Sequence, residues 1–343
     1  MEGSAAIRRR DLEGDSMRWV RLAATALGWA AVLAAAVGVL AHYLGSTITV
    51  LVVLASFAPF LMACGVIGLV ALACARRWVG TAVAAVVLVA AAWTQLPLYL
   101  GDRAADGDPE LTVMQANILF GQGDPEALVA QVRSRGVDVL TVNELTDGAI
   151  PRLGAAGLDE ELPYRYLRPM EWGGGGTGIW SRHPITEETE HMGFVLNMVS
   201  VRVHEPEQRP FVVVAAHPLP PWPRPQTTTW SAEMGQVRDI LQDLRGRGEP
   251  VIMGADLNAT YDHAQFRALI GDGYSDAAEQ SGAGVLRTYP ADRWWPPVLG
   301  IDHILVTGAV AVNAEAVDLP GSDHRGVVAE IDLSEPGDYS GSD

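Results

Sequence analysis

Eight acidic, amide and imidazole side chains stand where apolar runs of the sequence begin or end. In the stretch VIMGADLNAT, residues 251–260, an apolar run leads into Asp256 and Asn258, two positions apart. The full set is Asn117, Glu144, His217, Asp256, Asn258, Asp302, Asp323 and His324. Carboxylate and amide oxygens are ligands that Mg²⁺ prefers, and imidazole can carry a proton at neutral pH. Because ligands bind at the carboxyl ends of strands in α/β sheets, we expect these side chains to converge on one edge.

Each of these residues taken alone has a simpler explanation. Asp and Asn favour turns and helix N-caps, since their side chains accept hydrogen bonds from nearby backbone N–H groups. Asn117 fits a plain turn as well as a site, and a lone histidine before proline, such as His217, is typical of a loop. Asp302 is harder to explain this way, because a carboxylate inside an apolar strand needs a partner when it is buried.

The elements that would position these side chains form an α/β pattern. Residues 111–119 and 137–145 are apolar runs typical of strands, and Asp124-Pro125 predicts the start of a helix that ends near Arg135. Such a strand–helix–strand unit predicts a parallel pair of strands. Further strands are predicted at 177–181, 198–204, 211–217, 250–256, 300–307 and 326–333, and a helix at about 231–245.

Seven short motifs follow one another in a fixed order between about residues 111 and 333. They are ANI at 116–118, NEL at 143–145, GIWSRHPI at 178–185, AAHPLP at 215–220, GADLNA at 254–259, IDHIL at 301–305 and GSDH at 321–324. In this order they resemble the endonuclease/exonuclease/phosphatase family, which includes DNase I-like nucleases, neutral sphingomyelinases and inositol polyphosphate phosphatases. The resemblance implies an α/β fold, a four-layer α/β sandwich in which helices flank two packed sheets.

The resemblance also implies roles for the eight residues. Glu144 would be the principal Mg²⁺ ligand, with Asn117 beside it and Asp323 as a further ligand or orienting group. Asp256 would orient or deprotonate the attacking water, and Asn258 would hold the phosphate. His324 and Asp302 would form a pair that contacts the phosphoryl group. His217, the last catalytic group, would donate a hydrogen bond or proton near the scissile bond.

The chain departs from the family pattern at three points. The family has Gln before the metal-binding Glu, whereas this chain has Asn143. No carboxylate that would orient His217 can be identified. The Arg- or Lys-rich surfaces of DNA-repair members are absent, which weakens DNA as the natural substrate. The run of four glycines at 173–176 lacks the lysine of a phosphate-binding P-loop, so we interpret it as a flexible turn.

Three long uncharged stretches precede this domain, at Leu22–Ala41, Thr47–Ala75 and Trp78–Leu100. Each is long enough to cross about 30 Å of hydrocarbon as a helix. We expect three transmembrane helices that anchor the chain to the cell membrane. A cleavable signal peptide does not fit three spans.

Arginines give the expected orientation. Five precede the first span and two lie between the second and third, whereas the loop at 42–47 has no Arg or Lys. The positive-inside rule then places the N-terminus in the cytoplasm and everything after Leu100 outside the cell. Residues 1–100 hold 7 Arg and 4 acidic residues, and residues 101–343 hold 17 Arg and 37 acidic residues. A domain this acidic repels polyanions such as duplex DNA at long range.

The predicted organisation has five parts. They are a cytoplasmic segment at 1–21, a membrane anchor at 22–100, a linker at 101–110, the catalytic domain at 111–333 and a disordered tail at 334–343. Both cysteines, Cys64 and Cys74, fall in the second span, so the exterior domain uses neither a disulfide nor a thiolate.

The sequence therefore predicts a membrane-anchored, extracytoplasmic phosphodiesterase or phosphatase that depends on Mg²⁺ or Mn²⁺. Its substrate would be nucleic acid, as for a nuclease, or a phospholipid headgroup. Trp222, Trp294 and Trp295, in two Pro- and Trp-rich stretches, could either reach the membrane interface or pack under their loops. The alternative function is a non-catalytic anchored domain that binds a ligand or partner.

Overall fold

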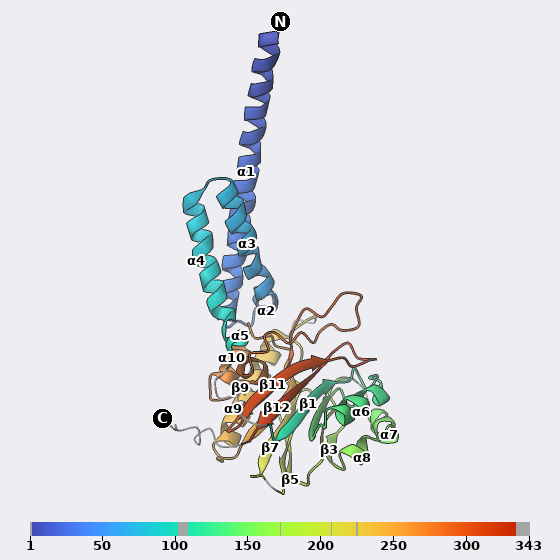
Figure 1. Ribbon diagram of the computed structural model, residues 1–343. Coiled ribbons are helices and arrows are strands. Elements are labelled where there is room, and N and C mark those ends of the chain that lie inside the picture. Colours follow the sequence, from blue (N-terminus) through green and yellow to red (C-terminus); the bar gives the residue numbers. More distant parts are fainter. Residues whose placement is uncertain (1, 102–108, 172, 207, 224–225, 334–343) are drawn as a thin grey trace. The chain divides into compact units, whose positions relative to one another are not determined.

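The computed structural model describes residues 2–101, 109–171, 173–206, 208–223 and 226–333, with the side chains of the first helix described from Ser16 on. Most of the predicted linker, residues 102–108, and the predicted tail at 334–343 lie outside the described residues. The chain divides into two compact units, one made of residues 1–44 and 57–96 and the other of residues 45–56 and 97–343 (Figure 1). We call them the helical unit and the catalytic unit.

The helical unit contains α1 (Glu2–Tyr43), α3 (Ala58–Cys74) and α4 (Trp78–Gln95). Residues 16–43 of α1 and the whole of α4 are long and apolar enough to cross a membrane. Many of their apolar side chains are exposed, such as Val79 and Trp93, as expected for helices that face lipid. Glycines allow close contact between the helices, since a Cβ on Gly28 would lie 2.6 Å from Leu72 Cγ.

The second predicted span, Thr47–Ala75, is not one helix. It consists of α2 (Thr49–Ser56) and α3, which are bent by 66° relative to each other at Phe57. Pro59 occupies the first turn of α3, where its missing N–H needs no partner, and a proline at this place ends the preceding helix. The described residues therefore contain two candidate spans, or three if the bent pair counts as one. The third prediction is also too long, because α4 ends at Gln95 and a short helix, α5 (Pro97–Leu100), follows.

Two mixed sheets of six strands each form the centre of the catalytic unit. The first has the order β11-β12-β1-β2-β4-β3 and the second β5-β6-β7-β8-β10-β9. The strands of the first are β1 (Leu111–Asn117), β2 (Val139–Asn143), β3 (Tyr164–Arg168), β4 (Thr177–Ser181), β11 (Val310–Val317) and β12 (Gly326–Asp332). Those of the second are β5 (Ile185–His191), β6 (Met198–Val203), β7 (Phe211–Ala216), β8 (Val251–Asp256), β9 (Ser275–Asp276) and β10 (Asp302–Thr307).

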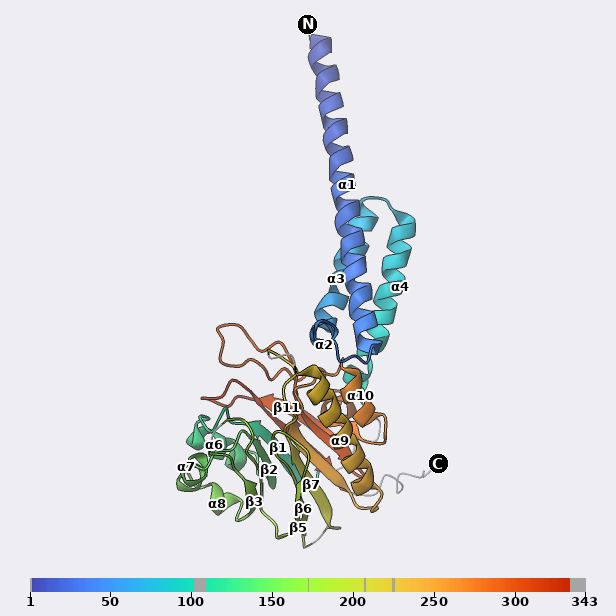
Figure 2. The same cartoon turned by 180° about the vertical axis from the view of Figure 1, so that it is seen from behind.

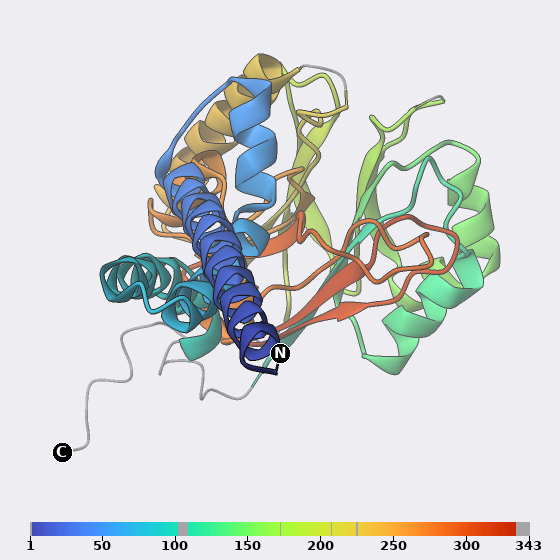
Figure 3. The ribbon, with the colours of Figure 1, turned by 90° about the horizontal axis from the view of Figure 1, so that it is seen from above.

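Helices cover the outer face of each sheet. Figure 3 shows α6 (Pro125–Ser134), α7 (Ala149–Ala155) and α8 (Leu158–Glu161), in green, beside the first sheet. The gold helix α9 (Thr227–Arg245) lies beside the second sheet, where α10 (Ala264–Ile270) also packs, and α11 (Ala277–Gln280) follows β9 (Figures 2 and 3). Besides the apolar contacts between sheets and helices, a separate apolar core fills the space between the two sheets. It includes Val113, Val201 and Ile304. The predicted four-layer α/β sandwich is confirmed.

Local sequence explains the elements that lead to the site. Asp124 caps α6 by accepting a hydrogen bond from Ala127 N, and Pro125 begins the helix, as predicted. The strands on either side of α6, β1 and β2, form the predicted parallel pair, with Asn117 opposite Asn143 at its carboxyl end. A second parallel pair, β7 and β8, lies in the other sheet. Helix α9 begins at Thr227, four residues earlier than predicted.

Candidate active site

The structure brings the eight predicted side chains to the same end of both sheets. Asn117 closes β1 and Glu144 follows β2, in the first sheet, and His217 follows β7 in the second. Asp256 closes β8 and lies opposite Asp302 at the start of β10, because these two strands are antiparallel. The remaining three residues of the set are Asn258 in the loop after β8 and Asp323 and His324 in the loop before β12.

Asp256 is the centre of this group and is only 1% exposed. Its Oδ1 accepts a hydrogen bond from the backbone N–H of Asn258 at 2.9 Å, which holds the turn after β8. Its Oδ2 accepts from Asn117 Nδ2, also at 2.9 Å, across the gap between the two sheets. The same oxygen lies 3.4 Å from His217 Nε2 and 3.7 Å from His324 Nε2. One carboxylate oxygen thus faces both histidines of the predicted set.

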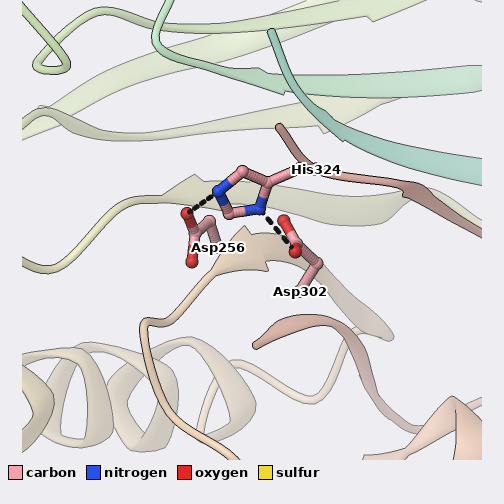
Figure 4. A group of neighbouring side chains, drawn as sticks. All are labelled: Asp256, Asp302 and His324. Atoms are coloured by element: carbon pink, nitrogen blue, oxygen red, sulfur yellow. Dashed lines mark hydrogen bonds and ion pairs between the residues drawn. The ribbon is translucent and has the colours of Figure 1, made fainter. Parts of the chain in front are cut away.

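His324 is held between two carboxylates, as Figure 4 shows. Its Nδ1 donates to Asp302 Oδ2 at 2.8 Å, and its Nε2 points toward Asp256. Burial of the ring disfavours the charged form, but the negative charges of Asp302 and Asp256 outweigh burial and raise the pKa of His324 to about 10. His324 is therefore a cation at neutral pH, with an N–H directed toward the centre of the site.

His217 takes its orientation from the backbone, which answers the question of its missing carboxylate. Its ring Nδ1 lies 3.0 Å from the carbonyl oxygen of Gly174, which can only accept, so Nδ1 carries the proton in this bond. The carbonyl belongs to the four-glycine run at 173–176. A Cβ on Gly176 would lie 1.7 Å from Leu145 O, so this run is a tightly packed turn beside the site. The run forms a turn, as predicted, but the close packing at Gly176 does not fit the flexibility that we expected.

Glu144 and Asp323 face the same region from the first sheet. Glu144 has a positive φ of 60°, which is rare for a residue with a side chain and is typical of functional sites. Its Oε1 accepts from Asn117 Nδ2 at 3.1 Å and its Oε2 accepts from Phe120 N at 2.8 Å. Burial raises the pKa of Asp323; the positive charge of His324 lowers it and the nearby negative charge of Glu144 raises it further. The two carboxylates are thus close enough to repel each other.

Sequence comparison assigns this arrangement to a known family. The sequence profile described as "Endonuclease/Exonuclease/phosphatase family" matches residues 114–324, which is more than half of the chain. The chain belongs to this family. Its members are metal-dependent phosphoric ester hydrolases, so the chain is an enzyme of that class. No curated protein matches the chain.

Solved structures confirm the endonuclease/exonuclease/phosphatase fold at low identity. A D. rerio TDP2 humanized by 14 mutations is 18% identical and has a TM-score of 0.54, with 65% of this chain and 98% of that chain covered. A truncated Caenorhabditis elegans TDP2 is 16% identical with a TM-score of 0.53, covering 65% and 97%. An endonuclease/exonuclease/phosphatase from Beutenbergia cavernae is 20% identical with a TM-score of 0.54, covering 66% and 72%. At these identities the likeness shows the fold alone.

The donor set of the site fits a hard divalent cation. Four carboxylates, those of Glu144, Asp256, Asp302 and Asp323, converge with one imidazolium, which leaves an excess of negative charge. Oxygen donors of this kind suit Mg²⁺ or Mn²⁺. Among the described residues, Asp256, Asp302 and His324 form a group whose potential ligand atoms all lie within 4.8 Å of one another. However, His324 is protonated on the nitrogen that bonds Asp302, so this trio is better suited to act on a substrate than to enclose the ion.

Asn117 remains a predicted metal ligand, although its contacts suggest an additional task. Its Oδ1 accepts from Leu119 N at 3.0 Å, while its Nδ2 bonds both Glu144 and Asp256. The amide therefore ties the carboxylate after β2 to the carboxylate at the end of β8. Asn258 also has a positive φ, of 49°, and its side-chain Nδ2 donates to Pro218 O at 3.1 Å. This contact links the turn after β8 to the loop that follows His217.

Two buried amides behind the site were not among the predicted residues. Gln115 is buried and its Nε2 donates to Asp302 Oδ1 at 3.0 Å and to Asn143 Oδ1 at 3.2 Å. Asn143 Oδ1 also accepts from Asp256 N, and its Nδ2 donates to Ala216 O on the second sheet. Gln115 could have been found from the sequence, because it is a polar residue in an apolar strand and shares a face with Asn117 two residues later.

The loop before β12 is fixed from both sides. Ser322 Oγ donates to Asn117 O at 2.7 Å and accepts from His324 N at 3.0 Å. The ring of Tyr289 lies 4.9 Å from that of His324, centroid to centroid. These contacts position the imidazolium without using its Nε2. Neither Ser322 nor Tyr289 was predicted, because each acts through a contact between segments that are distant in the sequence.

Proposed function

We propose that this chain is a membrane-anchored phosphodiesterase or phosphatase whose catalytic unit lies outside the cytoplasm and depends on Mg²⁺, with Mn²⁺ as a substitute. The observation that carries the proposal is the placement of His324 between Asp302 and Asp256. It presents a protonated imidazole nitrogen beside a buried carboxylate, in a site rich in oxygen donors. A phosphoryl group needs positive charge on one side and an activated water on the other.

Metal binding is assigned to Glu144 and Asp323, with Asn117 beside them. A bound divalent ion supplies charge neutralisation at the phosphoryl oxygens and orients the ester. Support comes from the negative charge of Glu144, which adds to burial in raising the pKa of Asp323, and from the unusual backbone conformation of Glu144. Asp256 and Asp302 are assigned to the water and the phosphoryl group instead, because each lies beside the His324 ring.

The proposed reaction is an in-line attack of water on phosphorus. Asp256 orients and deprotonates the water, since it is the buried carboxylate that every catalytic group faces. The Nε2–H of His324 donates to a phosphoryl oxygen, and Asp302 keeps the ring charged and oriented. In its doubly protonated form, His217 gives the proton on Nε2 to the oxygen that departs on the opposite side, while its Nδ1–H is held by Gly174 O. Asn258 binds a further phosphoryl oxygen in place of its bond to Pro218.

The substrate is proposed to be the phosphate ester of a nucleic acid or of a lipid headgroup. Another member of the fold, D. rerio TDP2, has been solved in complex with a single-strand DNA product. For this chain the 17 Arg and 37 acidic residues after residue 100 disfavour long-range attraction of a polyanion. The proposed orientation rests on the arginines that flank the spans, which place the N-terminus in the cytoplasm.

The test uses the full chain in detergent, beside Asp256→Asn and His324→Gln variants. Each is assayed on bis-p-nitrophenyl phosphate, single- and double-stranded DNA, RNA and phospholipid vesicles, with Mg²⁺, with Mn²⁺ and with EDTA. We expect metal-dependent turnover of at least one substrate and a fall of about 10³-fold or more in both variants. Absence of turnover by folded, metal-loaded wild-type protein on every substrate would contradict the proposal and favour a non-catalytic binding domain.

A further inference from the structure

Residues 45–56, which connect two helices of the helical unit, pack as part of the catalytic unit. Thr227 Oγ1 donates to Thr47 O, and Gln265 Nε2 donates to Ser46 O at 3.1 Å. On α2, Val52 is only 3% exposed and belongs to the core that contains Trp230 and Phe266. This segment begins two residues after α1 and ends two residues before α3, so it joins the catalytic unit to two apolar helices by a very short stretch of chain.

A second attachment follows the last helix of the helical unit. Helix α5 begins at Pro97, two residues after α4 ends, and its Leu98 is buried. Leu98 O accepts a hydrogen bond from Gly284 N at 2.7 Å, in the loop after α11. Because each residue of extended chain spans at most about 3.6 Å, the chain itself keeps the ends of α2 and α5 within a few ångströms of the proposed spans.

The long loop at 288–300 projects from the catalytic unit on the side that carries α2, as Figures 1 and 2 both show. Its stem is closed by backbone bonds between Tyr289 and residues Val298 and Leu299. Near its tip, Trp294 is 92% exposed and Trp295 is 40% exposed, and the two rings pack edge to face at 5.2 Å. The charged side chains beside them, Asp292 and Arg293, form an ion pair with each other.

The stem of this loop is part of the site. Tyr289 packs on the ring of His324, and Ala291 N donates to Asp323 O at 2.7 Å. Thr288 Oγ1 accepts from the backbone N–H of Asp302 at 3.4 Å. If the tip of the loop is held at a surface, the site is therefore held close to the same surface.

We propose that Trp294 and Trp295 insert into the interface of the membrane that anchors the chain, and that the substrate is a phosphate ester carried by a lipid of that membrane. Both clauses rest on the proposed function, the first on its membrane anchor and the second on its activity. Indole rings favour the headgroup level of a bilayer, and two adjacent exposed rings cost free energy in water that insertion recovers. Insertion through Trp needs no positive surface, which suits a domain with 17 Arg against 37 acidic residues. Exposed indole rings also stack on unpaired nucleobases, and it is the acidic surface, which repels a polyanion, that favours the lipid.

The position of the tip is tested directly, without reference to activity. The full chain with Cys64→Ala and Cys74→Ala receives a single Trp294→Cys or Tyr164→Cys substitution, labelled with a fluorescent probe and reconstituted into vesicles that contain spin-labelled lipid. Tyr164 is an exposed aromatic residue at the end of β3 that pairs with Ser181, away from the site, and serves as the matched control. We expect strong lipid quenching at 294 and little at 164. Equal quenching, with both probes accessible to aqueous iodide, would overturn the insertion and leave a free or protein-binding tip.

The substrate clause is tested with the same reconstituted chain carrying Trp294→Ser and Trp295→Ser together, beside Tyr164→Ser. Substrates are bis-p-nitrophenyl phosphate in solution and phosphatidylglycerol, sphingomyelin or phosphatidylinositol phosphate in the vesicle. Lipid turnover should fall roughly tenfold in the double variant, with soluble turnover within about twofold of wild type. Single-stranded DNA is assayed beside them, and equal turnover of lipid by variant and wild type, or preference of the wild type for the DNA, would overturn the clause. If the wild type turned over neither the soluble ester nor any lipid, the proposed activity would be rejected. The quenching result would still show whether the tip inserts.

Discussion

Two buried histidines, His324 in the loop before β12 and His303 on β10, show how the same kind of histidine–carboxylate pair serves different purposes. His324 bonds Asp302 at 2.8 Å, and His303, the residue next to Asp302 on β10, lies 3.4 Å from Asp276. Both rings are almost fully buried. In each case burial lowers the histidine pKa and the adjacent carboxylate raises it more, so that the net shift is upward. By composition and burial the two pairs are nearly alike.

They differ in what the second ring nitrogen contacts. His303 Nε2 lies 2.9 Å from Ala259 O and its ring packs on Phe266 at 4.2 Å, so both nitrogens are satisfied within the domain. His324 Nε2 has only Asp256 Oδ2 at 3.7 Å and Asp323 Oδ1 at 3.9 Å, distances too long for strong hydrogen bonds. A proton on that nitrogen is available to a ligand. The proposed catalytic pair differs from the structural pair mainly in its second ring nitrogen, which makes no strong hydrogen bond, and less in its carboxylate partner.

The alternation of side chains along β10 places the two pairs on opposite faces of the second sheet. Successive residues of a strand point to opposite faces, so Asp302 faces the site between the sheets and His303 faces α10 on the outer side. A substitution at either position tests one face alone, which makes the two pairs internal controls for each other.

The largest expected difference comes from removing each imidazole. His324→Gln should lower kcat/KM for bis-p-nitrophenyl phosphate by about 10³–10⁴-fold, because the charged donor to the phosphoryl oxygen is lost. His303→Gln should leave kcat/KM within a few fold and lower the free energy of unfolding by about 1–3 kcal/mol, since a buried ion pair and a packed ring are lost. Turnover and thermal unfolding of both full-chain variants check this. Equal loss of activity in the two would show that the free ring nitrogen does not matter.

Replacing the carboxylate partners should change activity less, and should shift its pH dependence in a defined direction. Asp302→Asn removes the nearest negative charge from His324, so its pKa should fall from about 10 and activity should be lost at lower pH than in the wild type. At pH 7 we expect a decrease of about 10–10²-fold. Asp276→Asn should leave the pH–rate profile unchanged. A profile of kcat/KM from pH 6 to pH 11 distinguishes the two, and an unmoved alkaline limb in Asp302→Asn would contradict the proposed charge state of His324.

The raised pKa of His324 also predicts how stability depends on pH. The ordinary pKa of an unfolded histidine is about 6.5, so the stabilisation is fully present below that pH and is lost as pH rises toward 10. Over this window each extra bound proton changes the free energy of unfolding by up to about 1.4 kcal/mol per pH unit. His324→Gln should flatten the slope. His303 contributes in the same direction, so the remaining slope should disappear only in the double variant, as denaturant unfolding at several pH values would show.

Much of the fold and of the site could be predicted from the sequence, for reasons visible at single positions. Asp124 and Pro125 fix the start of α6, and apolar runs ending in Asn117, Asp256 and their neighbours mark strands whose polar ends meet. The long apolar stretches were predicted less accurately, although three spans still fit if the bent pair counts as one. In 47–75 composition cannot reveal that a new helix begins at Ala58, next to Pro59, and that Val52 packs in the core of the catalytic unit.

Partners supplied by distant backbone are the part that sequence could not provide. Gly174 O orients His217, a role that we sought among carboxylates, and Ser322 and Tyr289 support His324 from loops whose approach depends on tertiary structure. The short Asn143, which departs from the family pattern, is joined to Asp302 by Gln115. The roles assigned to Glu144, Asp323 and the other site residues stay predictions until the variants are measured.

Gln115 offers the finest test of the comparison, because it touches Asp302 and has no contact with His303. Its Nε2 bonds Asp302 Oδ1, while its Oε1 is buried with no hydrogen-bond partner among the described residues. Gln115→Leu should remove one hydrogen bond to a charged acceptor, at a cost of about 1.5–3 kcal/mol, part of which appears as a modest loss of activity of about three- to tenfold.

The accompanying change in the pH–rate profile identifies Gln115 as a positioning residue. Without Gln115, Asp302 is held less firmly against the His324 ring, so the alkaline limb should move slightly to lower pH, in the same direction as for Asp302→Asn. Gln115→Glu places a second carboxyl group beside Asp302, which should cause a larger loss because the two charges repel or share a proton. If Gln115→Leu lowers stability but leaves both kcat/KM and the profile unchanged, the amide serves only to join the sheets, and the orientation of Asp302 comes from His324 and the strand alone.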